Sequence, residues 1–210
     1  MADVRFHPRV LELLASRICH DLVSPVGAIA NGLELLEELG EEGKDESFKL
    51  ISNSAAEASI RLKCFRLSYG TAGSDRNIGL DEVKEVFSEW IKAGRVKLDW
   101  QKSQLTDMPK GFAKTLLNLL ILAEECAHGD GVIRVSSLAD SKGIEISLTG
   151  KNPSFREKAE DALTDKVSMD DLDPRLVHAY ITGQFARHFG VSLEYKFGQE
   201  PPSLIFSLSV

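Results

Sequence analysis

The sequence predicts an α+β protein, in which an N-terminal helical hairpin is followed by an α/β-sandwich. Two long stripes of apolar residues, spaced three and four apart, occupy the first third of the chain and predict two helices. Beyond residue 79, short alternating segments are mixed with helical ones, which is typical of a sheet with helices on one face. The polar, glycine-bearing segment 70–79 separates the two patterns, so we expect two domains, residues 1–74 and 75–210.

The hairpin is predicted from its two apolar stripes. The first is broken only where Pro25 takes an apolar place, and its members are Leu11, Leu14, Ile18, Leu22, Ile29, Leu33 and Leu36. The second has nearly heptad spacing, and its members are Phe48, Ile51, Ala55, Ala58, Leu62, Phe65 and Tyr69. A short polar turn after Gly40 makes the helices antiparallel. Two helices cannot cover both stripes, so we expect a homodimer with a four-helix bundle, or else coverage by the second domain.

The second domain is predicted to contain three helices and five strands. The helical segments are residues 80–93, 110–127 and 172–189. The strand segments are residues 95–101, 132–138, 143–149, 191–197 and 203–210.

Composition excludes several classes of function. The net charge of -7 argues against nucleic acid as the main partner, because a phosphate backbone selects a basic surface. The three cysteines, Cys19, Cys64 and Cys126, have no CxxC spacing, which is typical of free thiols in a reducing cytosol. No export signal and no apolar run of about 20 residues is visible, so we expect a cytoplasmic protein without a membrane segment.

His20 is the candidate reactive residue. It lies two residues from both Ile18 and Leu22, so it points away from the apolar stripe of its helix. A neutral imidazole is nucleophilic at one nitrogen, and Asp21 can hold the proton on the other. Arg17, one turn earlier, can contact the oxygens of a phosphoryl group. No second His, Cys or carboxylate shares this face at ligand spacing, so no metal is expected.

The segment around His20 resembles the phosphoacceptor box of sensor histidine kinases. Residues 19–29, Cys-His-Asp-Leu-Val-Ser-Pro-Val-Gly-Ala-Ile, have the histidine, the acidic neighbour and the proline five residues later. Residues 20–36 and 61–73 resemble the ChpT-type histidine phosphotransferases of alphaproteobacteria, and the likeness extends over the whole chain. It implies that His20 is the phosphoacceptor, that Asp21 is the conserved acidic neighbour, and that the second domain is a degenerate kinase-type ATPase domain.

Such an ATPase domain needs three nucleotide-binding parts, and the sequence departs from each. In the asparagine box Asn118 is present, but Leu122 stands at the magnesium ligand and offers no oxygen. Residues 149–153 lack the aspartate and spaced glycines of the adenine-binding turn. Pro174 and Arg175 replace the glycines of the phosphate-binding lid. We therefore expect no bound ATP and no cofactor, with magnesium supplied only by the partner receiver domain.

The resemblance implies transfer of a phosphoryl group between receiver-domain aspartates. The donor would be the receiver of a hybrid kinase of the CckA type, and the acceptors would be response regulators of the CtrA and CpdR type. Candidate docking residues on the face of His20 are Ser24, Gly27 and Asn31, with simple solvation as the alternative reading. Two other functions stay open from the sequence: a histidine kinase with an atypical nucleotide pocket, and an inert dimerisation or scaffold module.

Overall fold

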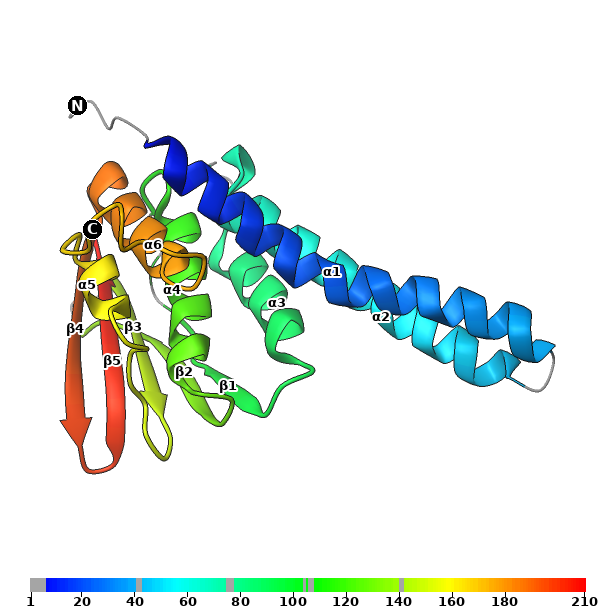
Figure 1. Cartoon of the computed structure of the whole chain (residues 1–210). Coiled ribbons are helices and arrows are strands. Elements are labelled where there is room, and N and C mark those ends of the chain that lie inside the picture. Colours follow the sequence, from blue (N-terminus) through cyan, green and yellow to red (C-terminus); the bar gives the residue numbers. More distant parts are fainter. Residues whose placement is uncertain (1–6, 41–42, 75–77, 104, 106–107, 140–141) are drawn as a thin grey trace.

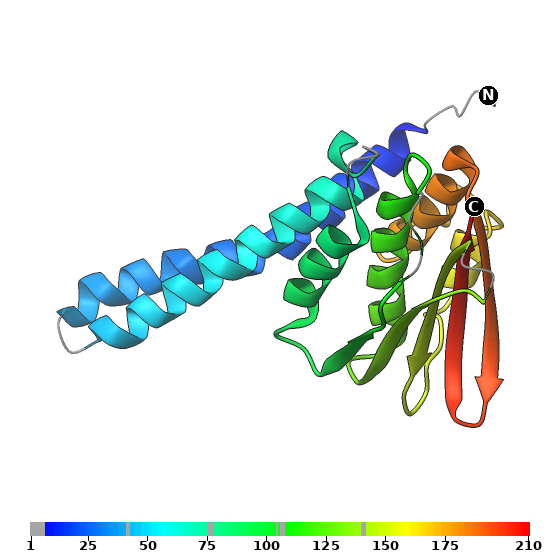
Figure 2. The same ribbon diagram turned by 180° about the vertical axis from the view of Figure 1, so that it is seen from behind.

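A computed structural model describes residues 7–40, 43–74, 78–103, 105, 108–139 and 142–210. A long helical hairpin projects from a mixed domain in which helices cover one face of a sheet (Figure 1; Figure 2 gives the view from behind). The predicted α+β class is confirmed.

The hairpin consists of α1 (Pro8–Leu39) and α2 (Lys44–Ser68). Pro8 occupies the first helical turn, where its missing N–H costs nothing, and the side chain of His7 accepts a hydrogen bond from the Arg9 N–H. Gly40 ends α1 at a positive φ of 56°. The helices approach closely at Gly32, where an added Cβ would lie 2.7 Å from Cγ1 of Ile51. Small residues thus allow the two helices to pack tightly.

Part of each predicted stripe does not face the other helix. In α2 the members Ile51, Ala58 and Phe65 are at least half-buried, as expected. The alternate members are exposed in the single chain, and they are Phe48, Ala55 and Leu62. On α1 the predicted positions Leu11 and Leu33 are exposed as well. Heptad spacing marks two faces, and a single partner helix covers only one of them.

The second domain is built on a five-stranded sheet. Its strands are β1 (Val96–Trp100), β2 (Gly131–Ser137), β3 (Gly143–Thr149), β4 (Ser192–Gln199) and β5 (Pro202–Ser209), in the order β1-β2-β3-β5-β4. Only β1 and β2 pair in parallel. Its longer helices are α3 (Leu80–Ile91), α4 (Phe112–Cys126) and α6 (Val177–Phe189), which lie on one face of the sheet (Figure 1). This layer of helices leaves the other face of the sheet to solvent.

Helix α5 and the start of helix α6 depart most from the sequence prediction. The short helix α5 (Ala159–Leu163) was not predicted, because five residues are too few to show a helical period. Helix α6 begins at Val177 rather than at residue 172. The side chain of Asp173 accepts hydrogen bonds from the N–H groups of Arg175 and Leu176, which forms a capped turn before the helix.

The base of the hairpin shares a hydrophobic core with the second domain. Val10, Cys64 and Leu67 are buried in the same cluster as the apolar residues of α4. Helix α4 is buried on all sides over most of its length, since every residue from Phe112 to Ala123 is buried. The second domain therefore covers the base of the hairpin, while the end with the turn projects away (Figure 1). The predicted boundary at residues 74 and 75 adjoins the undescribed residues 75–77 and stays a prediction.

Helix α1 is long and apolar enough to cross a membrane by length and composition alone. This differs from the prediction from the sequence, which was that no segment could span a membrane. Soluble proteins with long helices also meet this criterion, so it is weak evidence. Arg17 and Asp21 lie within α1 and face polar groups of the second domain, which does not suit a lipid environment.

Candidate functional site

His20 is displayed on α1 with its ring orientation fixed by its neighbour. Its side chain is 88% exposed, and Nδ1 lies 3.2 Å from Oδ1 of Asp21, whose side chain is only 21% exposed. An ionised carboxylate can only accept a hydrogen bond, so Nδ1 carries the proton and donates it to Asp21. Nε2 then keeps its lone pair and points to solvent as the nucleophilic atom. The structure thus brings His20 and Asp21 together, and their roles in phosphoryl transfer stay a prediction.

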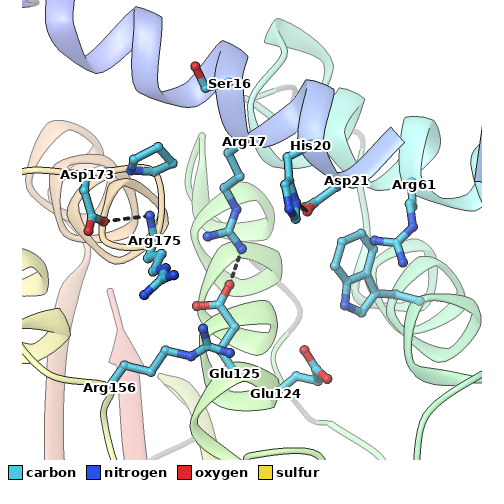
Figure 3. Close-up of a pocket in the computed structure, with 12 residues that line it drawn as sticks. Ser16, Arg17, His20, Asp21, Arg61, Glu124, Glu125, Arg156, Asp173 and Arg175 are labelled. Atoms are coloured by element: carbon cyan, nitrogen blue, oxygen red, sulfur yellow. Dashed lines mark hydrogen bonds and ion pairs between the residues drawn. The ribbon is translucent and has the colours of Figure 1, made fainter. Parts of the chain in front are cut away.

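The imidazole opens onto a cleft of about 880 Å³ between the hairpin and the second domain. Figure 3 shows charged side chains on both walls of this cleft. The lining residues are Ser16, Arg17, His20, Asp21, Arg61, Trp90, Glu124, Glu125, Arg156, Asp173, Pro174 and Arg175. The second domain therefore supplies seven of the twelve residues that line this cleft beside His20.

Arg17, one turn before His20, forms an ion pair with Glu125 of α4 through Nη2, while its Nε has no hydrogen-bond partner among the described residues. The two side chains are 14% and 15% exposed. Burial alone would lower the pKa of Arg17, but Glu125, with Tyr69 and Asp21, outweighs that effect and raises the pKa above its ordinary value. The predicted contact of Arg17 with a phosphoryl group is not tested by this geometry.

The wall beside α2 and α3 is closed by an aromatic side chain. The guanidinium of Arg61 lies 5.4 Å from the ring centroid of Trp90 and hydrogen-bonds Glu57 one turn earlier. Trp90 and Glu124 both line this side of the cleft. Burial, and then the adjacent charge of Glu125, raises the pKa of the Glu124 carboxyl. This wall holds its charged groups in fixed positions.

The wall opposite the hairpin carries two exposed arginines, Arg156 and Arg175 (Figure 3). Arg175 follows Asp173, whose carboxylate caps the turn before α6. Within the described part of the chain, neither guanidinium has an ion pair within 4.0 Å. The cleft thus presents cationic groups to an anionic molecule at His20.

The three predicted docking residues lie outside this cleft. Ser24, Gly27 and Asn31 are exposed on α1, further toward the hairpin turn. An added Cβ at Gly27 would meet no atom within 4 Å. Their surface is open, and their role in docking stays a prediction.

Several cleft residues were not found by sequence reasoning. Glu124 and Glu125 are two carboxylates in the last turn of a largely apolar helix, where negative charge opposes the helix dipole. This unfavourable placement of two carboxylates could have indicated that a positively charged side chain from another segment pairs with them. Arg156 and Arg175 carry no such signal, because only the tertiary fold brings them opposite His20.

The residues at the expected nucleotide site do not suit ATP. Leu122 is 1% exposed within the core. The Asn118 amide donates to the backbone oxygens of Ser68 and Lys114, at 2.8 Å each, so it has no free donor for a ligand. Among the described residues, no group of three His, Cys, Asp or Glu side chains is placed to hold a metal ion.

Comparisons with known proteins identify the family. Residues 80–201 match the model of the histidine phosphotransferase C-terminal domain. The protein phosphotransferase ChpT of Brucella abortus (strain 2308) is 32% identical over 184 residues, which cover 86% of this chain and 87% of that protein. A solved structure of a bacterial phosphotransferase has a TM-score of 0.81 at 27% identity and covers 98% of each chain. This chain therefore belongs to the histidine phosphotransferase family and is of the ChpT type.

Proposed function

We propose that this protein carries a phosphoryl group on Nε2 of His20 and exchanges it with aspartates of receiver domains, without using ATP. The observation that carries the proposal is the exposed imidazole whose Nδ1–H is held by Asp21. That contact leaves one nitrogen free to attack and stabilises the positive charge that the ring acquires. The exposed position leaves room for a protein, rather than only a small molecule, to reach the ring.

The two proteins together account for every bond that forms or breaks in the transfer step. The lone pair of Nε2 attacks the phosphorus of an aspartyl phosphate in line with the P–O bond to the carboxylate. The N–P bond forms as that P–O bond breaks, and the partner's aspartate leaves as a carboxylate. The imidazolium keeps its Nδ1 proton, which stays hydrogen-bonded to Asp21, so no proton is transferred in this direction. The same step in reverse loads a second receiver, with magnesium supplied by the receiver.

The second domain supports transfer without ATP. Leucine at position 122 is enclosed by the core, and the amide of Asn118 is used to bind the hairpin. A kinase with an atypical nucleotide pocket is therefore not favoured. Arg17 has guanidinium donors beyond the one on Glu125, which supports a contact with the transferring phosphoryl group.

The partners follow from the ChpT-type family. The proposed donor is the receiver domain of a CckA-type hybrid kinase, and the proposed acceptors are regulators of the CtrA and CpdR type, in the cytoplasm. Ser24, Gly27 and Asn31 are proposed contacts for the docked receiver, since they lie exposed on the helix that bears His20.

A homodimer is proposed from the uncovered face of the hairpin. On α2 the exposed apolar residues Phe48, Ala55 and Leu62 recur every seven residues. On α1 the exposed apolar residues are Val23, Val26 and Leu33, at steps of three and seven. Heptad steps on both helices are the pattern of a helix bundle, and a two-fold axis buries both faces at once.

The test is a labelled-phosphate transfer assay on the full chain, run with ATP alone and with a phosphorylated CckA-type receiver. We expect an acid-labile label only with the receiver, and complete loss of that label in His20→Ala. Label from ATP alone would establish a kinase. If no phosphorylated receiver labels the wild-type protein, the inert scaffold reading is correct.

A further inference from the structure

The second domain holds the hairpin through charged and polar contacts near His20, in addition to the shared core. One such contact is the ion pair between Arg17, one turn before His20, and Glu125 of α4. Both side chains are largely buried, so removal of one partner leaves an uncompensated charge in a poorly solvated site. The orientation of α1 at His20 is thereby tied to α4.

A second set of contacts connects α4 and α6 to the end of α2. The Tyr69 hydroxyl lies 2.8 Å from Nδ1 of His178, and Nε2 of His178 lies 3.0 Å from the backbone oxygen of Asn118. The side chain of Asn118 donates to the oxygen of Ser68, and Nζ of Lys114 donates to the oxygen of Tyr69 at 3.4 Å. These oxygens belong to the last turn of α2 and have no partner within the helix.

The direction of each hydrogen bond follows from the burial of His178. Its side chain is fully buried, and burial lowers its pKa to about 4, so the ring is neutral at cellular pH. Nε2 must donate, because it faces a carbonyl oxygen, and Nδ1 therefore accepts from the Tyr69 hydroxyl. Both ring nitrogens of His178 and the amide nitrogen of Asn118 are matched, which favours a single geometry, whereas the buried Oδ1 of Asn118 has no hydrogen-bond partner among the described residues.

We propose that these two connections make α4 the support that positions His20 for phosphoryl transfer, with Glu125 and Tyr69 as positioning residues. The inference rests on the proposed function. Asn118, which a kinase would direct toward nucleotide, here fixes the end of the helix that pairs with α1. The second domain thus affects the reaction by fixing the position of the hairpin, and with it the position of His20.

The experiment measures transfer to the full-length protein from a ³²P-labelled CckA-type receiver, at increasing receiver concentrations. Glu125→Gln removes one charge at constant volume, and Tyr69→Phe removes one hydroxyl. We expect the maximal rate of each variant to fall roughly ten- to a hundredfold, as for other small misplacements of a reacting group, with half-saturation little changed. Glu125→Asp keeps a carboxylate and should recover part of the rate.

Matched controls lie on the sheet, away from the cleft. Tyr195→Phe removes a hydroxyl that donates to Glu160, and Asp99→Asn breaks an exposed ion pair with Arg134. Both should transfer at the wild-type rate. A fluorine probe on exposed Cys19, in separate samples, should change its resonance in Glu125→Gln and Tyr69→Phe and not in the controls.

The outcomes separate this inference from the proposed function. Wild-type rates in folded Glu125→Gln and Tyr69→Phe would overturn the positioning role and leave the proposed function intact. A loss of rate that disappears when the assay is run well below the melting temperature would also overturn it, since it reflects stability alone. Absence of label in the wild-type protein would instead overturn the proposed function.

Discussion

The two ends of the hairpin are built from the same kind of helix and have different partners. At the base, α1 and α2 pack on α3, α4 and α6 of the same chain and take part in its core. Toward the turn, the two helices project away from the second domain (Figure 1), and large apolar side chains such as Leu33 and Phe48 remain exposed. The contrast teaches that the apolar side chains of one end are covered within the chain, and that those of the other end are left for the proposed second copy to cover.

The largest expected effect comes from a charge on the uncovered end. Phe48→Glu places a carboxylate where the proposed bundle buries an aromatic ring. Because of the two-fold axis, the burial free energy of this ring is lost twice in each dimer. Burial of one phenylalanine contributes about 2 kcal/mol, so the dimer dissociation constant should rise roughly a thousandfold. Sedimentation should then show a mass near the 23.1 kDa of one chain.

The control for that prediction is Phe197→Glu. Phe197 is 54% exposed on β4, close to the 52% of Phe48, and it lies far from the hairpin turn. This variant should keep the wild-type mass. A wild-type protein that sediments as a monomer at micromolar concentration would refute the dimer.

An intermediate effect on stability is expected when the pH is lowered, because His178 is buried at the base of the hairpin. The folded pKa of His178 is about 4, against about 6.5 in the unfolded chain, chiefly because the ring is buried. Its contribution to stability is fully present above pH 6.5 and is lost as the pH falls toward 4, where the unfolded chain binds the extra proton. The free energy of unfolding should fall by roughly 3 kcal/mol across this window from this group alone.

Denaturant unfolding of wild-type protein and His178→Gln at pH 7 and pH 5 measures this contribution. The pH slope should be shallower in the variant. Glu124, whose pKa is raised by burial, acts in the opposite direction in both proteins, so the difference between them isolates His178. Equal slopes would show that His178 is not neutral and buried in solution.

The smallest effect concerns two glycines of α1. Gly32→Ala puts a Cβ 2.7 Å from Cγ1 of Ile51, and this overlap should outweigh the gain in helix propensity and destabilise by about 1 kcal/mol. Gly27→Ala meets open space and should stabilise by up to about 1 kcal/mol. Melting temperatures of the two variants that shift in the same direction would contradict this packing of the hairpin.

The sequence predicted the parts of this protein that depend on local periodicity. The three longer helices of the second domain, the two of the hairpin and all five strands lie where the spacing placed them, with shifts of a few residues at their ends. His20 was found because its exposure follows from its position two residues from the apolar stripe. The resemblance around His20, together with substitutions such as Leu122, predicted a degenerate ATPase domain without nucleotide ligands, and this stays a prediction.

What the sequence could not predict depends on contacts between distant segments. Glu125 lies 108 residues from Arg17, and no pattern near either residue states that they pair. Heptad spacing marked Phe48 and Ile51 equally, and only the fold shows which of them meets α1. The second wall of the cleft, with Arg156 and Arg175, comes from loops whose positions are set by the sheet.

The hydrogen bonds from Asn118 and His178 have a consequence for how the parts of such proteins can be exchanged. A module that is recombined between relatives keeps its structure only if few contacts cross its boundary. Here the final turn of α2 has its backbone oxygens bound by side chains of α4, and Cys64 and Leu67 lie in the core of the second domain. A hairpin grafted onto a foreign second domain would lose these partners, so we expect the segment that bears His20 to keep its structure only together with the domain beneath it.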